Sequence, residues 1–114
     1  MTNTTITRDE LQAAIRDGDV LVVETLGPQY YEDAHLPGAI NIPHTDTARL
    51  APELLPDKAA AIVTYCSNTA CRNSEIAAAQ LRSLGYTDVR KYAEGKDDWR
   101  DAGLPLQSGA AVAV

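Results

Sequence analysis

The stretch AIVTYCSNTACRNSEIAAAQLRSLG, residues 61–85, carries the clearest structural signal in this chain of 114 residues. Its first five residues form an apolar, β-branched run that is typical of a buried strand. Residues 74–84 have apolar side chains three and four positions apart, which predicts a helix, and a glycine follows as its stop. Both cysteines of the chain, Cys66 and Cys71, lie in the polar segment between these two elements. The stretch therefore predicts a strand, a short loop and a helix.

The same alternation runs through the rest of the chain. Further strands are predicted at residues 20–24, 39–42 and 89–92, and further helices at residues 29–35, 48–54 and 95–102, with glycines and prolines between them. Thr7 and Glu10 fit a capping box that starts another helix, which Gly18 ends. This order predicts an α/β fold with a mostly parallel sheet and helices on both faces. Ligands of such sheets bind beyond the carboxyl ends of the strands, which is where Cys66 is expected.

One domain is expected over residues 1–106, followed by a small, apolar tail at 107–114 that we expect to be frayed.

Composition and charge exclude several classes of function. The net charge of −6 argues against a nucleic-acid partner, because phosphates need Lys and Arg. No apolar run approaches the roughly 20 residues of a membrane span, and the N-terminus lacks the order of a signal peptide. We therefore expect a cytoplasmic protein without membrane contact.

Cys66 is predicted to lie where a strand turns into a helix. Loop N–H groups and the helix N-terminus can point toward its sulfur and form a cradle for an anion. A thiol in such a cradle ionises more easily than an ordinary cysteine and becomes a nucleophile. The alternative is that Cys66 is a small core residue at the end of a strand. The residues that follow it are small and polar and suit tight turns, which favours the reactive interpretation.

Three segments resemble the rhodanese-like family. The segment YYEDAHLPGAINIP, residues 30–43, is similar to the family's G-H-I-P-G-A-x-N-I-P segment, and AIVTYC, residues 61–66, is similar to the strand that delivers its catalytic cysteine. The segment AAAQLRSLGYTDVRKYAEGKDDWRDAGLPL, residues 77–106, is similar to the family's closing pattern. The three segments occur in the family's order and cover nearly the whole chain.

The resemblance implies a rhodanese-like domain with a five-stranded, mostly parallel sheet. It also implies a sulfurtransferase of the thiosulfate type, in which Cys66 takes a sulfur atom from a small donor and carries it as a persulfide. A thiophilic acceptor, such as cyanide, a thiol or a partner protein, would then remove the sulfur, and neither a metal nor an organic cofactor is implied. The residues expected to form the substrate-binding loop are Ser67, Asn68, Thr69, Ala70, Cys71, Arg72 and Asn73.

The chain departs from the family's usual pattern at two places. The loop is longer than usual and lacks glycine, and Arg72 follows Cys66 with the C-x5-R spacing of the family's phosphatases and arsenate reductases. Phosphatase or arsenate reductase activity is therefore an alternative function. On the first strand, Glu24 keeps the family's acidic position, but Leu26 stands where an arginine is usual. The missing cation weakens the case for thiosulfate, a dianion, as the donor.

Cys71 leaves further alternatives open. As a second thiol in the loop, it could resolve a persulfide on Cys66 through a disulfide, which would make the domain a redox relay. It could also face solvent or pack beneath the loop, and the domain could be a non-catalytic binding module. A zinc site is not expected, because His35 and His44 give no recognised ligand spacing with the two cysteines. Gly95 is expected at the rim of the site, where the lack of a side chain would admit substrate.

Overall fold

The structure, a computed structural model, describes residues 4–109. Its centre is a parallel sheet of four strands in the order β2-β1-β3-β4. The strands are β1 (Leu21–Glu24), β2 (Ile40–Asn41), β3 (Ile62–Tyr65) and β4 (Val89–Tyr92). Glu24 pairs with Tyr65, and Tyr65 pairs with Tyr92. The carboxyl ends of the three longer strands therefore lie level with one another, directly before Cys66.

The expected fifth strand is replaced by a single bridge. Thr5 pairs in parallel with Lys91 of β4, and the backbone bonds on either side join Ile6 N to Lys91 O and Lys91 N to Thr4 O. The chain cannot extend this pairing because Thr7 already caps the first helix. Within residues 4–109 the expectation of five strands was therefore wrong. Residues 4–6 contact the outer edge of β4 in place of a strand.

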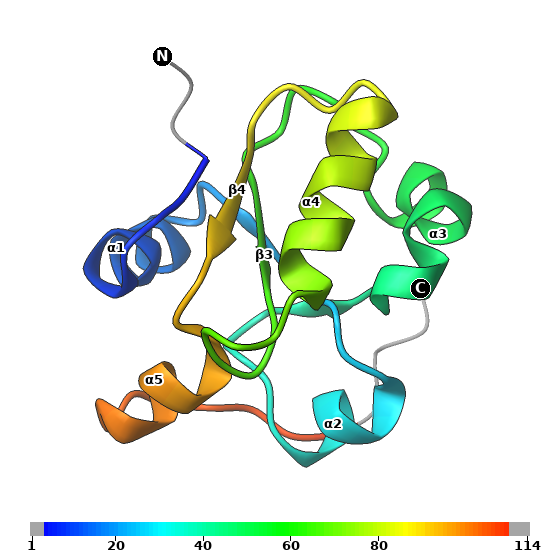
Figure 1. Ribbon diagram of the computed structural model, residues 1–114. Helices are drawn as coiled ribbons and strands as arrows, with labels where there is room; N and C mark the ends of the chain where they lie inside the picture. The colour runs from blue at the N-terminus through cyan, green and yellow to red at the C-terminus, as the bar shows by residue number, and fades with distance from the viewer. Residues whose placement is uncertain (1–3, 110–114) are drawn as a thin grey trace.

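Helices cover both faces of the sheet. In the views from above and below, α1 (Arg8–Asp17) and α5 (Gly95–Asp101) lie on one side, and α3 (Thr47–Leu54) and α4 (Asn73–Ser83) lie on the other. The short helix α2 (Pro28–Asp33) lies with α5 at the end of the molecule where the strands finish, as Figure 1 shows. A 3₁₀ turn, η1 (His44–Asp46), leads into α3. The predicted helices are confirmed, with ends that differ by one or two residues.

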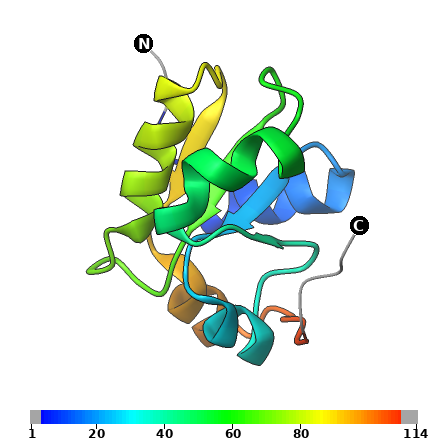
Figure 2. The ribbon, with the colours of Figure 1, turned by 90° about the vertical axis from the view of Figure 1, so that its right-hand side faces the viewer.

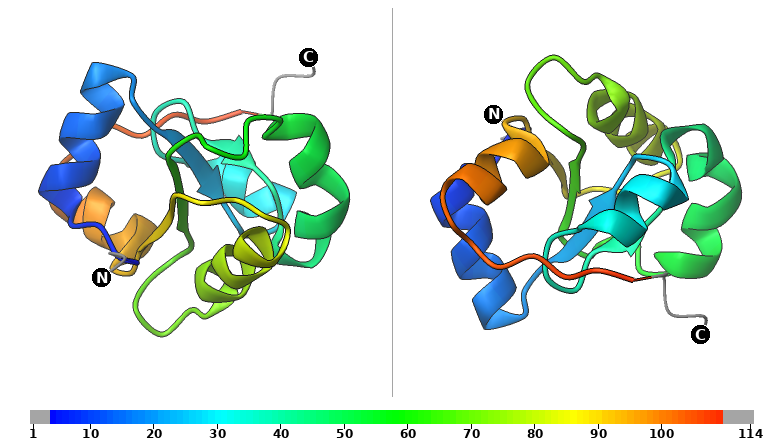
Figure 3. Two further views of the ribbon diagram at one scale, coloured as in Figure 1. Left: turned by 90° about the horizontal axis from the view of Figure 1, so that it is seen from above. Right: turned by 90° about the horizontal axis from the view of Figure 1, so that it is seen from below.

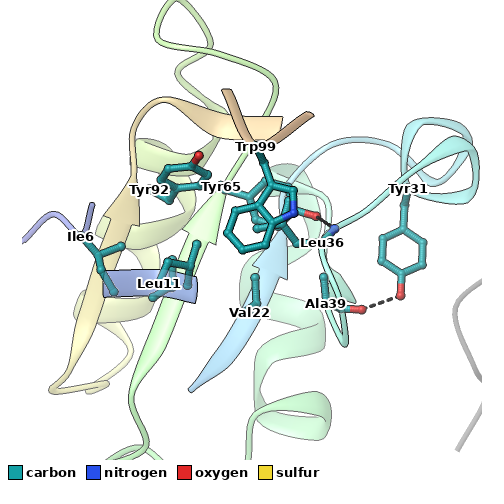
Figure 4. Packing of buried hydrophobic residues seen from close by; sticks show 10 residues of the cluster. Ile6, Leu11, Val22, Tyr31, Leu36, Ala39, Tyr65, Tyr92 and Trp99 are labelled. Carbon is teal, nitrogen blue, oxygen red and sulfur yellow. Dashed lines mark hydrogen bonds between the residues drawn. The ribbon is translucent and has the colours of Figure 1, made fainter. Parts of the chain in front are cut away.

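Two layers of apolar side chains form the core. Alternate residues of each strand point to opposite faces, so neighbouring residues of β1 and β3 belong to different layers. The layer beneath α1 and α5 includes Leu11, Val22, Tyr65 and Trp99, which Figure 4 shows packed together. The other layer lies against α3 and α4 and includes Val23, Leu55, Ile62, Leu81 and Tyr86. Both faces of the sheet are dry, which explains the near-continuous apolar strands in the sequence.

Local sequence signals account for the helix ends. Thr7 accepts a hydrogen bond from the backbone N–H of Glu10, whose carboxylate accepts one from the backbone N–H of Thr7, so the predicted capping box is confirmed. Gly18 ends α1 in the left-handed region with φ 74°. On α4, however, Ile76 is 42% exposed, although helical spacing suggested a core position. The small residues Ala77 and Ala78 form the buried face instead, which lets α4 lie close to the sheet.

The end of the described chain is held to the domain. Gln107 pairs with His35 through two backbone hydrogen bonds of 2.8 Å, and the N–H of Gly109 donates to the carbonyl of Glu32. The frayed tail expected at 107–114 therefore does not begin at Gln107, and residues 110–114 lie outside the described residues. None of the helices described over residues 4–109 is long and apolar enough to span a bilayer.

Candidate active site

Cys66 directly follows β3, at the carboxyl end of the central part of the sheet. The loop that it starts runs to Arg72 and then enters α4, and Figure 2 shows the same segment bulging from the body of the molecule. Cys66 itself is only 2% exposed, whereas Asn68, Thr69 and Ala70 are exposed. The buried sulfur thus lies beneath a loop that is open to solvent.

The structure joins Cys66 and Cys71 in a disulfide, with 6.3 Å between their Cα atoms. The Sγ atom of Cys66 also lies 3.4 Å from the backbone oxygen of Cys71 and 3.5 Å from the Oγ atom of Ser74. These neighbours are polar, and Cys66 belongs to neither apolar layer of the core. Cys66 is thus buried as deeply as a core residue, whereas the neighbours of its sulfur are polar.

The backbone of the loop is organised by Asn68. Its side-chain oxygen accepts a 3.0 Å hydrogen bond from the N–H of Ala70, and its backbone oxygen accepts a 3.1 Å bond from the N–H of Cys71. Its side-chain amide donates to Asp97 of α5. Two of the N–H groups expected to face the sulfur, those of Ala70 and Cys71, are thus used inside the loop.

Other donors of the loop remain available. Within residues 4–109, the N–H groups of Ser67, Asn68, Thr69 and Arg72 have no hydrogen-bond acceptor. The first turn of α4 follows immediately and adds the unpaired N–H groups that every helix N-terminus presents. These donors are the part of the structure that could hold an anion beside Cys66.

Gly95 brings the start of α5 against the loop. The N–H of Lys96 donates to the carbonyl of Cys66, and the N–H of Asp97 donates to the carbonyl of Ser67, each at 2.8 Å. A Cβ atom at residue 95 would lie 2.6 Å from the Cys66 oxygen and 2.7 Å from the carbonyl carbon of Ser67. Gly95 is also in the left-handed region, with φ 73°. Its missing side chain therefore makes room for the backbone of the loop, whereas the sequence suggested that it would admit substrate.

A buried ion pair lies behind the loop. Lys96 Nζ is 3.0 Å from Oε1 of Glu24, and that same oxygen accepts a 2.8 Å hydrogen bond from the hydroxyl of Tyr65. The Tyr65 hydroxyl in turn accepts from the N–H of Leu36. Among the residues that the structure describes, Oε2 of Glu24 is buried and has no hydrogen-bond partner. Burial raises the pKa of Glu24, although the hydrogen bonds from Tyr65 and Lys96 act in the opposite direction.

Lys96 was not singled out by the sequence. Besides Glu24, its ammonium contacts the backbone oxygens of Tyr30 and Ala34 at the end of α2, at 3.0 and 2.6 Å. Its neighbours in sequence are acidic, and two of these side chains are engaged in contacts: Asp98 pairs with Arg8 and Tyr92, and Asp97 with Asn68.

The remaining candidate residues lie apart from the sulfur or point away from it. The Arg72 side chain is 79% exposed and pairs with Glu75 at 3.4 Å. The His35 ring stacks on Tyr31, and its Nδ1–H donates to the Tyr31 backbone oxygen. His44 lies in η1, where its N–H donates to the Thr25 carbonyl. Within residues 4–109 no three His, Cys, Asp or Glu side chains gather in a way that could hold a metal ion.

Comparison with known proteins agrees with this geometry. Residues 7–102 match the sequence profile described as the rhodanese-like domain. The chain belongs to the rhodanese-like domain family. Its architecture is shared with the BH2092 protein of Bacillus halodurans, whose crystal structure superposes with a TM-score of 0.86 at 27% identity, covering 93% of this chain and 77% of that one.

Two relatives of this rhodanese-like domain have different names. An HTH-type transcriptional regulator of Mycobacterium tuberculosis, Rv0324, is 37% identical over 94% of this chain, but the chain spans only 46% of the regulator's length. The thiosulfate sulfurtransferase PspE of Escherichia coli is 36% identical over 72% of this chain and 73% of its own length. The relatives include a protein named as an enzyme and a longer protein named as a regulator, so membership alone does not identify the reaction.

Proposed function

We propose that this domain is a sulfurtransferase that accepts sulfane sulfur on Cys66 as a persulfide. The observation that carries the proposal is the position of the Cys66 sulfur at the end of β3, beside Ser74 and below a loop with unpaired N–H donors. The similarity to PspE, whose name gives thiosulfate as its substrate, supports the same reaction. A cytoplasmic setting suits the proposal, because a reducing compartment keeps both thiols of the loop available.

The reaction that we propose uses Cys66, Ser74 and the unpaired N–H groups of the loop. Reduction of the Cys66–Cys71 disulfide frees the Cys66 thiolate, which attacks the outer sulfur of thiosulfate. The sulfur–sulfur bond of thiosulfate breaks, sulfite leaves with the bonding electrons, and the persulfide remains on Cys66. The N–H groups of the loop and the hydroxyl of Ser74 would stabilise the negative charge on the attacking and departing groups. A thiol, cyanide or a partner protein then attacks the outer sulfur and carries it away.

The surroundings also affect which donor is suitable. Leu26 is buried and supplies no positive charge, and the ammonium of Lys96 is already paired with Glu24. A doubly charged donor must therefore be bound mainly by backbone N–H groups. We infer that thiosulfate is accepted with weak binding, and that a donor of lower charge, such as an organic persulfide, is bound better.

The outward position of Arg72 disfavours the phosphatase or arsenate reductase alternative. In that chemistry, the arginine that closes a C-x5-R loop has to contact the oxyanion that the loop encloses. Here its guanidinium pairs with Glu75 and is largely exposed. To reach an oxyanion beside Cys66, the Arg72 side chain would have to break its ion pair with Glu75 and rotate toward the loop.

A single-turnover experiment tests the proposal. The reduced protein, freed of excess thiol, is mixed with thiosulfate, and sulfite is measured against protein concentration. We expect about one sulfite for each Cys66, because one sulfur atom is transferred for each sulfite released. The variant Cys66→Ser should give none, since a serine hydroxyl stays protonated near neutral pH. Turnover of an aryl phosphate without any release of sulfite would point to the phosphatase instead.

A regulatory module is the second candidate. It is favoured by the 37% identity to a transcriptional regulator of about twice this length and by the disulfide within the loop. In this case the redox or sulfur state of Cys66 would be the signal, and turnover would be slow. Release of one sulfite followed by no further cycles in the presence of excess thiol would favour this candidate over an enzyme.

A further inference from the structure

We propose that Cys71 is a resolving thiol that expels the transferred sulfur from Cys66 as sulfide, so that the loop itself completes the reduction of the donor. This inference rests on the proposed function, because it needs a persulfide on Cys66. It adds a second reaction to the site: the sulfur need not pass to an external acceptor, and the product is hydrogen sulfide.

The first support is the direct bond between the two side chains. The Cα atoms of Cys66 and Cys71 are 6.3 Å apart, within the range of about 4.4–6.8 Å that a disulfide requires. The two Sγ atoms are therefore bonded directly to each other, with no further sulfur atom between them. The inner sulfur of a Cys66 persulfide is this same atom, so it is the atom that Cys71 reaches.

The second support is the internal bonding of the loop. The N–H of Cys71 donates to the backbone oxygen of Asn68, which turns the chain back toward residue 66. The Asn68 side chain accepts from the N–H of Ala70 and donates to Asp97 of α5. The turn is therefore tied both within itself and to a helix. Because the turn is held in this way, little ordering is needed to bring the second thiol to the first.

The third support is the set of unpaired N–H donors in the loop that begins at Cys66. The N–H groups of Ser67, Asn68 and Thr69 have no acceptor within the described residues. They can stabilise the outer sulfur of the persulfide and also the hydrosulfide anion as it departs. The segment 68–70 is exposed, so the loop that covers Cys66 lies at the surface of the domain.

The step balances without an outside oxidant. The thiolate of Cys71 attacks Sγ of the Cys66 persulfide, and a new bond forms between the two Sγ atoms. The bond from Cys66 Sγ to the outer sulfur breaks, and that sulfur leaves with the electron pair as hydrosulfide. A dithiol reductant then supplies two electrons and two protons and restores both cysteines. Over a full cycle, thiosulfate and a dithiol give sulfite, hydrogen sulfide and the oxidised dithiol.

The experiment uses the reduced, thiol-free protein under anaerobic conditions with one equivalent of thiosulfate. Sulfite and sulfide are measured separately, and the intact mass is determined at the end. We expect the natural chain to release about one equivalent of each and to finish about 2 Da lighter than the reduced protein, because a disulfide has formed. A parallel sample without thiosulfate should keep its reduced mass.

The variant Cys71→Ser separates the two reactions. It should release sulfite but no sulfide, and it should retain a gain of about 32 Da, the mass of the persulfide sulfur, until cyanide is added. Sulfite release by this variant also shows that its loop still folds. A stable persulfide on the natural chain, or sulfide release by the variant, overturns the role of Cys71 and leaves the proposed function standing. Absence of sulfite from both proteins overturns both proposals.

Discussion

Replacing Gly95 by alanine should loosen the contact between α5 and the loop of Cys66. The added Cβ atom would lie 2.6 Å from the Cys66 carbonyl oxygen, closer than carbon and oxygen can approach. The obstacle is backbone and cannot rotate away, so α5 and the loop must separate. Two hydrogen bonds of 2.8 Å, from Lys96 N and Asp97 N, would be stretched or lost.

The size of the effect can be worked from these contacts. An alanine in the left-handed region costs about 1–2 kcal/mol. Loss of two backbone hydrogen bonds adds roughly 0.5–1.5 kcal/mol for each bond. The total is about 2–5 kcal/mol in the free energy of unfolding, measured by urea denaturation. Sulfite release from thiosulfate should also fall, because the first two residues of the loop move.

Gly103 offers a matched control for this variant. Its φ is 76°, nearly that of Gly95, but a Cβ atom there would meet no atom of residues 4–109 within 4 Å. Gly103→Ala should therefore show only the cost of the left-handed backbone, about 1–2 kcal/mol, with sulfite release retained. Equal destabilisation of the two variants would refute the argument that the close approach of α5, beyond the backbone angle alone, requires Gly95.

Three further predictions concern stability. Lys96→Met should cost about 3 kcal/mol by urea denaturation, because it leaves the Glu24 carboxylate buried without its cation; a loss below about 1 kcal/mol would show that the pair is dispensable. Burial raises the pKa of Glu24 above its ordinary value of 4.5, so the folded state holds this proton more tightly than the unfolded state does. The free energy of unfolding should therefore fall as the pH rises from 4.5 through the raised pKa. Glu24→Gln should remove that part of the slope, and an unchanged slope would assign it to other groups. Thr7→Ala should cost about 1 kcal/mol through loss of the capping box, whereas Thr87→Ala, which loses only an exposed hydrogen bond of 3.4 Å, should cost less.

The architecture could be predicted because its signals are local. The capping box at Thr7, the apolar run of β3 and the helical spacing after Ser74 each depend on neighbouring residues. Ile76 was misplaced because spacing identifies a stripe along a helix but not its exact centre, and two alanines provide the closer contact. The prediction of a fifth strand was wrong because it came from the family resemblance, whereas in this chain the cap at Thr7 leaves room for only one bridge to β4.

The surroundings of Cys66 could be predicted only in part. Its place at the end of a strand followed from the sequence, but the contacts around it come from distant segments. Lys96 reaches Glu24 from 72 positions along the chain, and its neighbours in sequence are acidic and suggest a solvated surface. The spacing of C-x5-R likewise gave no information on the direction of the Arg72 side chain, which Glu75 determines.

The ammonium of Lys96 has a consequence for how the domain opens. From α5, it contacts two backbone carbonyls at the end of α2 and the carboxylate of Glu24 at the end of β1. Detachment of α2 would leave the Lys96 ammonium without two of its buried acceptors, and detachment of α5 would leave the buried Glu24 carboxylate without its cation. Transient opening near the sulfur should therefore be a concerted event, in which the amides of α2 and α5 exchange with solvent at matching rates.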